Sequence, residues 1–286
     1  MRLVTYDAGS GPLGGVLRGE EIVPLAALRA PSDSVRGLLG ALDAEGLAAL
    51  GERAAGQAGD RLRRADVRLL APVPDPEKII CMGLNYRDHA EEAHQEIPEH
   101  PRWFAKFANS LIGDGEPIVL PAAHPDFVDY EAELAVVIGR RCHEVSEDEA
   151  LACVAGAMPL NDVSARDLQL QNPLWTSGKA IDTFAPCGPA LVTLDEAGDL
   201  GNLAVRTRVD GELLQDGSTE DMIFSVAQTV AWLSRTMTLV PGDIIATGTP
   251  AGVGGFQGRF LRAGQTVEVE IEGLGSVSNP VRTAAA

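Results

Sequence analysis

The segment that most constrains the fold is 129–139, "DYEAELAVVIG", where acidic residues alternate with others and then lead into an apolar run. Residues 134–138 are apolar and mostly β-branched or small, which predicts a buried strand. Side chains alternate along a strand, so Asp129, Glu131 and Glu133 are expected on one side, roughly 6.5 Å apart. Carboxylates held that close repel one another unless protons or a cation neutralise them.

The same spacing has a simpler interpretation, a solvated strand edge. The segment "EVEIE", residues 268–272, repeats the Glu-x-Glu spacing, and Val267, Val269 and Ile271 alternate with its glutamates. That pattern predicts an amphipathic strand with one wet face. The spacing by itself therefore does not identify a metal site, and further residues must converge on the first pair of glutamates.

Composition limits the classes of partner. The chain has 286 residues, is 45 % hydrophobic and carries a formal net charge of −18. Such a surface repels phosphate backbones and anionic membranes, so we expect no nucleic-acid partner. No apolar stretch approaches the ~20 residues of a membrane span, and the first residues lack a signal-peptide pattern. Four cysteines without a CxxC motif give no disulfide framework, so we expect a reduced, cytoplasmic protein.

The chain is predicted to form two units of an α+β, mainly β, protein. Residues 1–72 read as a small α/β domain, with strands in "MRLVTYD" and "LGGVLRGEEIVPL" and one or two Ala/Leu-rich helices in 33–56. The proline-rich "LLAPVPDPEK" is the expected connector, and residues 77–286 form the larger domain. There, Ser-x-x-Glu at 146–149 and Ser-x-x-Gln at 225–228 each predict a capped helix, the first of them Ala-rich and running through "ALACVAGAM". The segment "RVDGELLQDG" predicts a hairpin with an Asp-Gly turn.

Asp162, in "MPLNDVSARDLQ", is the residue that can complete a metal site with Glu131 and Glu133. An Asx turn or a helix cap is the alternative role for this aspartate. Three carboxylates without a neighbouring His or Cys suit a hard cation, Mg²⁺ or Mn²⁺. Zinc fits poorly, because His89 and His94 are five residues apart and would point in different directions from a helix.

The segment "GLNYRDHAEE" supplies a candidate acid–base pair. His89 and Glu92 are three residues apart, which makes them neighbours on a helix face. A carboxylate that holds one imidazole nitrogen leaves the other free to take a proton from water. An ordinary exposed His–Glu pair is the alternative.

Lysine is rare in this chain, which has 20 arginines and only three lysines. Lys106 follows an aromatic pair in "RWFAKFANS", and Lys179 lies in the Gly- and Pro-containing "WTSGKAIDTFAPCGP". Arg166 and Gln169 come shortly after Asp162. Together these side chains can hold a carboxylate or stabilise an enolate oxygen. The Gly-rich "TGTPAGVGG" lacks the GK[ST] of a P-loop, and no GxSxG elbow is present.

Five segments in order, "GLNYRDHAEE", "DYEAELAVVIG", "NDVSARDLQ", "GKAIDTFAPCGP" and "PGDIIATGTPAGVG", resemble the fumarylacetoacetate hydrolase family over residues 77 to 282. The likeness is to its short domain-containing members. The resemblance implies a mixed β-sandwich roll, a homodimer, and Mg²⁺ or Mn²⁺ held at Glu131, Glu133 and Asp162. It also implies that His89, Glu92 and Lys179 are catalytic. We assign substrate binding to Lys106, Arg166, Gln169 and Thr249.

The family's substrates are 2-oxo acids, which implies three hypotheses. The first is a metal-dependent hydrolase that cleaves a carbon–carbon bond of an acylpyruvate or related 2,4-dioxo acid through an enolate, with water activated by His89 and Glu92. The second is an isomerase, tautomerase or decarboxylase of a related oxo acid such as oxaloacetate, since the same enolate serves these reactions. The third is a metal-retaining binding protein without turnover.

Overall fold

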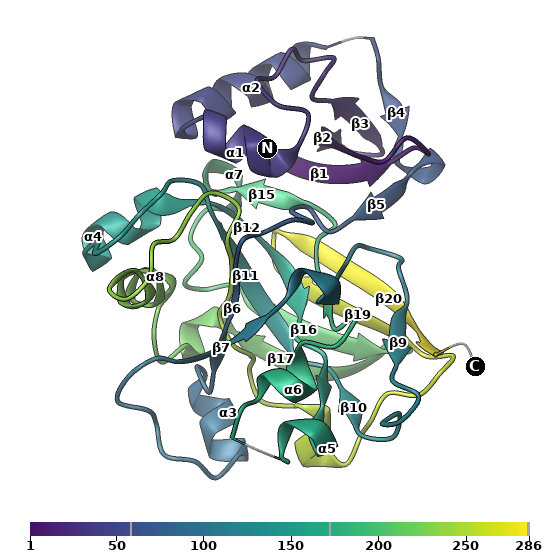
Figure 1. Ribbon diagram of the computed structural model, residues 1–286, viewed down its shortest axis with the longest axis vertical. Coiled ribbons are helices and arrows are strands. Elements are labelled where there is room, and N and C mark those ends of the chain that lie inside the picture. Colours follow the sequence, from purple (N-terminus) through teal and green to yellow (C-terminus); the bar gives the residue numbers. More distant parts are fainter. Residues whose placement is uncertain (58, 172, 285–286) are drawn as a thin grey trace.

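One large mixed sheet runs through most of the protein (Figure 1). It is seen in a computed structural model that describes residues 1–57, 59–171 and 173–284. Its strands lie in the spatial order β4 (Leu62–Arg63), β3 (Glu21–Pro24), β2 (Pro12–Arg18), β1 (Arg2–Asp7), β15 (Leu191–Thr193), β12 (Val154–Asn161), β11 (Ala132–Ile138), β18 (Ile244–Ala246), β6 (Ile79–Gly83) and β7 (Arg102–Lys106), with β5 (Arg68–Leu70) also paired to β1.

A second sheet packs beside the first and gives the larger domain its two-layered character. Its order is β17 (Glu212–Ser218), β16 (Ala204–Val209), β19 (Thr266–Ile271), β20 (Gly275–Thr283) and β9 (Ile118–Leu120). Val205, Val269 and Val277 from this sheet share a hydrophobic cluster with Leu134 and Val136 of β11. The sequence-based expectation of an α+β, mainly β, fold is confirmed.

Strand β11 is buried on both faces, as its apolar run predicts. Leu134 and Val136 belong to the cluster between the two sheets, whereas Ala135 and Val137 belong to a second cluster that reaches the N-terminal helices. All seven residues of this strand are buried. The glutamate at position 133 therefore sits inside the protein, at a strand end that its neighbours cover completely.

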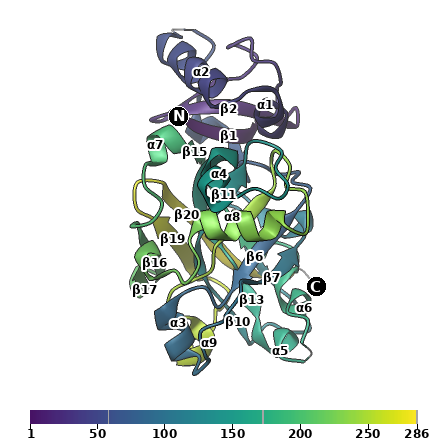
Figure 2. The same cartoon turned by 90° about the vertical axis from the view of Figure 1, so that its left-hand side faces the viewer.

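The N-terminal residues contain both helices and strands, as the sequence predicts. Helices α1 (Val35–Ala41) and α2 (Ala44–Gly56) are capped by Ser34 and Asp43, whose side chains accept hydrogen bonds from Gly37 N and Gly46 N. Strand β1 pairs with β15, so the large sheet is continuous between the N-terminal residues and the rest of the protein (Figures 1 and 2). The division into domains 1–72 and 77–286 stays a prediction.

The Ala-rich helix predicted after Ser146 is wrong in extent. The capping box forms, but α4 (Glu147–Ala150) ends after one turn, a 3-10 turn follows at Leu151–Cys153, and residues 154–161 are the central strand β12. Alanine and glycine in "VAGAM" fit closely packed neighbours here, since Gly156 lies against the β15 backbone. Tertiary packing overrides the helix propensity of alanine.

The remaining elements surround the end of the large sheet farthest from the N-terminal unit or connect its strands (Figure 2). The predicted Asp-Gly hairpin is confirmed, with Asp210 and Gly211 both at positive φ between β16 and β17. The helix expected around His89 and Glu92 is present as α3, which ends at Glu92. The elements outside the two large sheets are α3 (Arg87–Glu92), β8 (Leu111–Ile112), β10 (Val128–Asp129), β13 (Ser164–Ala165), α5 (Arg166–Gln169), α6 (Thr176–Lys179), β14 (Ala185–Pro186), α7 (Leu194–Ala197), α8 (Val226–Ser234) and α9 (Gly254–Gln257).

Among the described residues, none of the helices combines the length and the apolar character that crossing a membrane requires.

Helix α8 depends on its capping box, which leads to a stability prediction. Ser225 Oγ accepts from Gln228 N at 3.2 Å, and the Gln228 side chain accepts from Ser225 N at 3.0 Å. We expect Ser225→Ala to lower the free energy of unfolding by about 1 kcal/mol, because an orphan N–H is left at the helix start. Urea denaturation measures the change. The control Ser10→Ala, in the exposed β1–β2 turn, should shift it by less than about 0.5 kcal/mol; equal shifts in both variants would contradict the prediction.

Candidate active site

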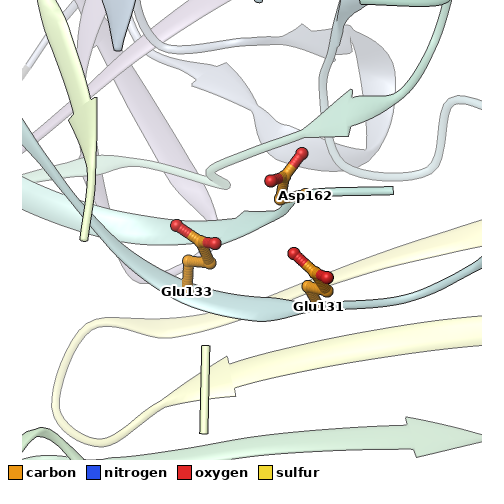
Figure 3. Close-up of side chains that lie close together, drawn as sticks. All are labelled: Glu131, Glu133 and Asp162. Carbon is orange, nitrogen blue, oxygen red and sulfur yellow. The ribbon is translucent and has the colours of Figure 1, made fainter. Parts of the chain in front are cut away.

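Three carboxylates from two segments meet at the end of β11 and β12. Ala132 of β11 pairs with Asn161 of β12, and Asp162 N donates to Glu131 O at 2.9 Å, so this register sets Asp162 beside the glutamates. Glu131, Glu133 and Asp162 each offer an oxygen, and these atoms lie within 4.8 Å of one another (Figure 3). All three are buried, with exposed fractions of 6 %, 1 % and 0 %. Asp162 therefore lies beside Glu131 and Glu133, which their Glu-x-Glu spacing alone could not establish.

Two lysines hold this carboxylate cluster from the side of the core. Lys179 Nζ donates to Glu131 Oε2 at 2.6 Å and to Asp162 Oδ2 at 2.8 Å. Lys106 Nζ donates to the other Asp162 oxygen, at 2.6 Å, and to Val163 O. Although burial lowers it, the carboxylates of Asp162 and Glu131 keep the pKa of the Lys179 ammonium above its usual value. Lys179 therefore serves as a fixed positive charge between Glu131 and Asp162.

Arg166, at the start of α5, ties the cluster to a fourth carboxylate. Its guanidinium donates to Asp129, to Glu131 and to Gln169 Oε1. Asp129 is fully buried and also accepts from Gly255 N. Burial, opposed by Arg166, raises the pKa of Asp129 to about 6. In this geometry the carboxylate of Asp129 orients Arg166.

Glu133 differs from the other carboxylates because no lysine or arginine of the described chain lies within salt-bridge distance of it. Its hydrogen-bond partner is the backbone N–H of Gly248, at 2.9 Å. Burial, together with the charges of Asp162 and Glu131, raises the pKa of Glu133 well above its usual range. By contrast, although burial raises it, Lys179 and Arg166 hold the pKa of Glu131 well below the usual range.

The cluster as a whole is short of positive charge. Four carboxylates, at 129, 131, 133 and 162, face three cations, at 106, 166 and 179, which leaves an excess of one negative charge. A divalent cation would remove the excess and supply the partner that Glu133 lacks. The residues present therefore fit Mg²⁺ or Mn²⁺, with ligand oxygens from Glu131, Glu133 and Asp162. Their role as ligands stays a prediction.

His89 and Glu92 lie together on α3, as predicted from their spacing. His89 Nδ1 is 3.3 Å from Glu92 Oε2, and Glu92 Oε1 accepts from Gly252 N at 3.0 Å. Although burial raises it, the hydrogen bonds from His89 and Gly252 hold the pKa of Glu92 below its usual range. The imidazole packs edge-on against Phe256 of α9, with 5.6 Å between ring centroids. An ionised Glu92 that receives Nδ1–H leaves Nε2 as the reactive nitrogen.

His89, Glu131, Glu133 and Lys179 line one cavity of about 240 Å³, which suits a small acid. The structure brings Arg166, Gln169 and Thr249 to its wall, as the sequence analysis proposes for substrate-binding residues. Lys106 does not line this cavity, because its ammonium is turned into the core toward Asp162, so substrate contact by Lys106 is not supported by the geometry. The wall comprises the charged and polar residues His89, Gln95, Glu131, Glu133, Arg166, Gln169, Lys179 and Thr249 and the apolar or small residues Met82, Gly83, Leu84, Ala93, Phe104, Leu170, Trp175, Gly255 and Phe256.

Two features of the site escaped the sequence analysis. The aromatic rings of Phe104 and Trp175 pack edge to face, with 5.7 Å between centroids, and line the cavity together with Lys179. Gln215, from the second sheet, reaches the loop that carries Thr249. No local pattern marks these residues, since their strands or turns lie far from the carboxylates along the chain.

Comparison with known proteins places residues 78–282 in a match to the family model "Fumarylacetoacetate (FAA) hydrolase C-terminal". The chain is 47 % identical over 224 residues to "Oxaloacetate tautomerase fahd2, mitochondrial" of Xenopus laevis, covering 77 % of this chain and 70 % of the relative. A 5-carboxymethyl-2-hydroxymuconate delta-isomerase from Mycobacterium smegmatis has a similar crystal structure, with a TM-score of 0.80 and 34 % identity over the whole of both chains. So has maleylpyruvate hydrolase from Sphingobium sp. SYK-6, solved with manganese(II) and pyruvate, with a TM-score of 0.83 and 32 % identity, again over both whole chains.

Removing the charge of Glu133 should weaken metal binding. We expect Glu133→Gln to lower the affinity for Mn²⁺ by more than about tenfold, because an amide oxygen replaces an anionic ligand. Calorimetric titration of the metal-free protein measures it. Glu268→Gln alters the matched Glu-x-Glu pair on the wet face of β19 and should leave the affinity unchanged. Equal affinities in the Glu133 and Glu268 variants would contradict the assignment.

The same substitution should stabilise the protein when metal is stripped by a chelator. The folded-state pKa of Glu133 lies above its unfolded value, so folding is favoured by the protonated form. Its ionisation cost is absent below the unfolded pKa and grows as the pH rises toward the folded pKa. We therefore expect Glu133→Gln to raise the melting temperature at pH 7 and to raise it less at pH 4. A shift that is independent of pH would show that charge is not the cause.

Proposed function

The chain belongs to the fumarylacetoacetate hydrolase family, and on that premise we propose that it is an enzyme that interconverts the keto and enol forms of a small 2-oxo diacid such as oxaloacetate. The observation that carries the proposal is the arrangement of the cavity. A buried carboxylate cluster with Lys179 lies at its base, and the His89–Glu92 pair lines its wall. Relatives whose names give oxaloacetate tautomerase activity support the choice of substrate.

The 2-oxo acid head would bind at the base of the cavity. Arg166 and Gln169 are placed to hold a carboxylate, and Lys179 supplies a positive charge where the ketone oxygen becomes an enolate. Mg²⁺ or Mn²⁺ on the carboxylate triad would act as a Lewis acid toward the chelating carboxylate and ketone oxygens. Met82, Phe104 and Trp175 supply an apolar wall for the bound acid.

Tautomerisation then needs one proton to leave carbon and one to reach oxygen. His89 Nε2 takes a proton from the carbon next to the ketone, the C–H electron pair becomes the C=C bond, and the carbonyl pair moves to oxygen. The imidazolium gives up this proton, one proton is delivered to the enolate oxygen to form the enol, and the reverse sequence gives the ketone, so no net proton is gained or lost. Glu92 stabilises the imidazolium in between through Nδ1. The reaction consumes no water.

Hydrolysis of an acylpyruvate, the first hypothesis from the sequence, is the second candidate. The imidazole that takes a proton from carbon can equally take one from water, and the similar maleylpyruvate hydrolase gives this route a precedent. Hydrolysis also needs space for the acyl group beyond the oxo-acid head. The cavity, about 240 Å³, is small for a long acyl chain, which favours the tautomerase.

A pair of assays tests the proposal. We expect the Mg²⁺-loaded protein to accelerate loss of the enol absorbance of oxaloacetate, and His89→Gln to lower kcat by about 10²- to 10⁴-fold, because the proton acceptor is lost. His143→Gln, at an exposed position, is the matched control and should retain full activity. Pyruvate release from acetylpyruvate is followed in parallel. Acetylpyruvate cleavage without any enol turnover would overturn the tautomerase proposal in favour of the hydrolase.

A further inference from the structure

Gln215, in the middle of β17, is a buried amide that joins the metal-ligand strand to the cavity wall. Its side chain is 1 % exposed and makes four hydrogen bonds. Oε1 accepts from Ala132 N at 2.9 Å and from the Thr207 hydroxyl at 2.7 Å. Nε2 donates to Thr249 Oγ1 and to Pro250 O, both at 2.9 Å. The hydrogen-bonding capacity of this amide is therefore used in full.

The orientation of this amide is fixed by its backbone partners. A backbone N–H, that of Ala132, can only donate, so the atom facing it must be the oxygen of Gln215. A backbone carbonyl, that of Pro250, can only accept, so the atom facing it must be the nitrogen. In a flipped amide, the N–H group would face the Ala132 N–H and the carbonyl oxygen would face the Pro250 carbonyl oxygen. Neither contact is a hydrogen bond, which is costly for a buried residue.

This orientation determines how the hydroxyl of Thr249 is used. Because Nε2 donates to it, Thr249 Oγ1 is an acceptor toward Gln215, and its own hydrogen must point elsewhere. Among the hydrogen bonds of the described residues, this hydroxyl donates none, although the side chain is only 3 % exposed and lines the cavity. Because Thr249 lines the cavity, the hydrogen of this hydroxyl is available to a ligand bound there.

We propose that Gln215 is a positioning residue that makes the Thr249 hydroxyl a dedicated donor to a carboxylate oxygen of the bound oxo acid. The inference rests on the proposed function and adds to it a specificity element for the acid head. An anionic oxygen accepts this hydrogen bond, whereas a ligand group that only donates would be rejected.

The same amide fixes the distance between this donor and the carboxylate triad. Ala132, whose N–H it accepts, lies between Glu131 and Glu133 in the chain. Gly248, next to Thr249, donates its N–H to Glu133 Oε2 at 2.9 Å. The loop that carries the hydroxyl is therefore tied to the ligand strand at two points. A ligand that chelates the triad meets a donor at a set position beside it.

Binding of oxalate to the Mg²⁺-loaded protein tests the role of the hydroxyl. We expect Thr249→Val, which keeps the shape but not the hydroxyl, to weaken oxalate binding about 10- to 100-fold, the effect of a lost hydrogen bond to a charged group. Thr249→Ser, which restores the hydroxyl, should recover most of this affinity. Titration calorimetry measures both. Oxalate affinity in Thr249→Val equal to that of the unaltered protein would overturn the proposal.

A second pair of variants tests Gln215 itself. Gln215→Met removes the donor to Thr249 and should weaken oxalate binding several-fold, to an extent between the wild-type and Thr249→Val proteins. Thr207→Val removes a hydrogen bond from the far side of the same amide and should change oxalate affinity by less than about twofold, which separates positioning from general loosening. In a Thr249→Val background, Gln215→Met should have no further effect on oxalate affinity. Equal losses from Gln215→Met with and without Thr249 would overturn the coupling.

Steady-state kinetics separate substrate positioning by these residues from a purely structural role, because only positioning changes KM without changing kcat. If the hydroxyl binds the unreacting carboxylate, Thr249→Val and Gln215→Met raise KM for oxaloacetate and leave kcat nearly unchanged. A fall in kcat alone would contradict the assigned role. The oxalate titrations stand without turnover, so failure of the tautomerase proposal and failure of this inference are distinguishable. If Gln215→Met does not fold, the Thr249→Val and Thr249→Ser pair still decides whether the hydroxyl binds the ligand.

Discussion

Four carboxylates and three cations lie together inside this protein, where each isolated charge would cost several kcal/mol to remove from water. Mutual attraction offsets that cost for Glu131 and Asp162, which Lys179 joins, and for Asp129, which Arg166 holds. Glu133 is left without a positively charged partner among the described residues. The cluster therefore carries uncompensated negative charge, which a divalent cation can neutralise. Glu133, which carries this charge, lines the cavity where substrate would bind.

The fold holds these carboxylates in fixed positions relative to one another. Strand β11 is buried on both faces, and its register with β12 sets Asp162 beside Glu131. Side chains that belong to packed strands keep their geometry better than those on free loops. By contrast, His89 and Glu92 lie on the one-and-a-half-turn helix α3, which is held to the loop at 251–252 by hydrogen bonds from Ala251 N and Gly252 N to Asp88 and Glu92. The carboxylate cluster is thus built onto packed strands, whereas His89 and Glu92 lie on a short helix tied to a loop.

Sequence reasoning succeeded where the relevant contacts are local or periodic. The apolar run 134–138 predicted a buried strand, and its alternation predicted that Glu131 and Glu133 share a side. It failed where local preference and packing disagree: the alanines in 152–157 favour a helix, yet they lie in a 3-10 turn and in strand β12. Lys106 was placed near the substrate from its aromatic neighbours, but those neighbours do not show which way its ammonium points.

The sequence by itself determined the elements, the helix caps, the Asp-Gly turn and the set of charged residues available for chemistry, because these depend on neighbours a few positions away. Family resemblance added their functional assignment. Only the tertiary structure decided which charges are paired, that Glu133 lacks a cation, that Lys106 faces the core, and that the Gln215 amide reaches Thr249. Those facts depend on strands from both sheets meeting at one point, and the distance between such residues is set by packing rather than by their separation along the chain.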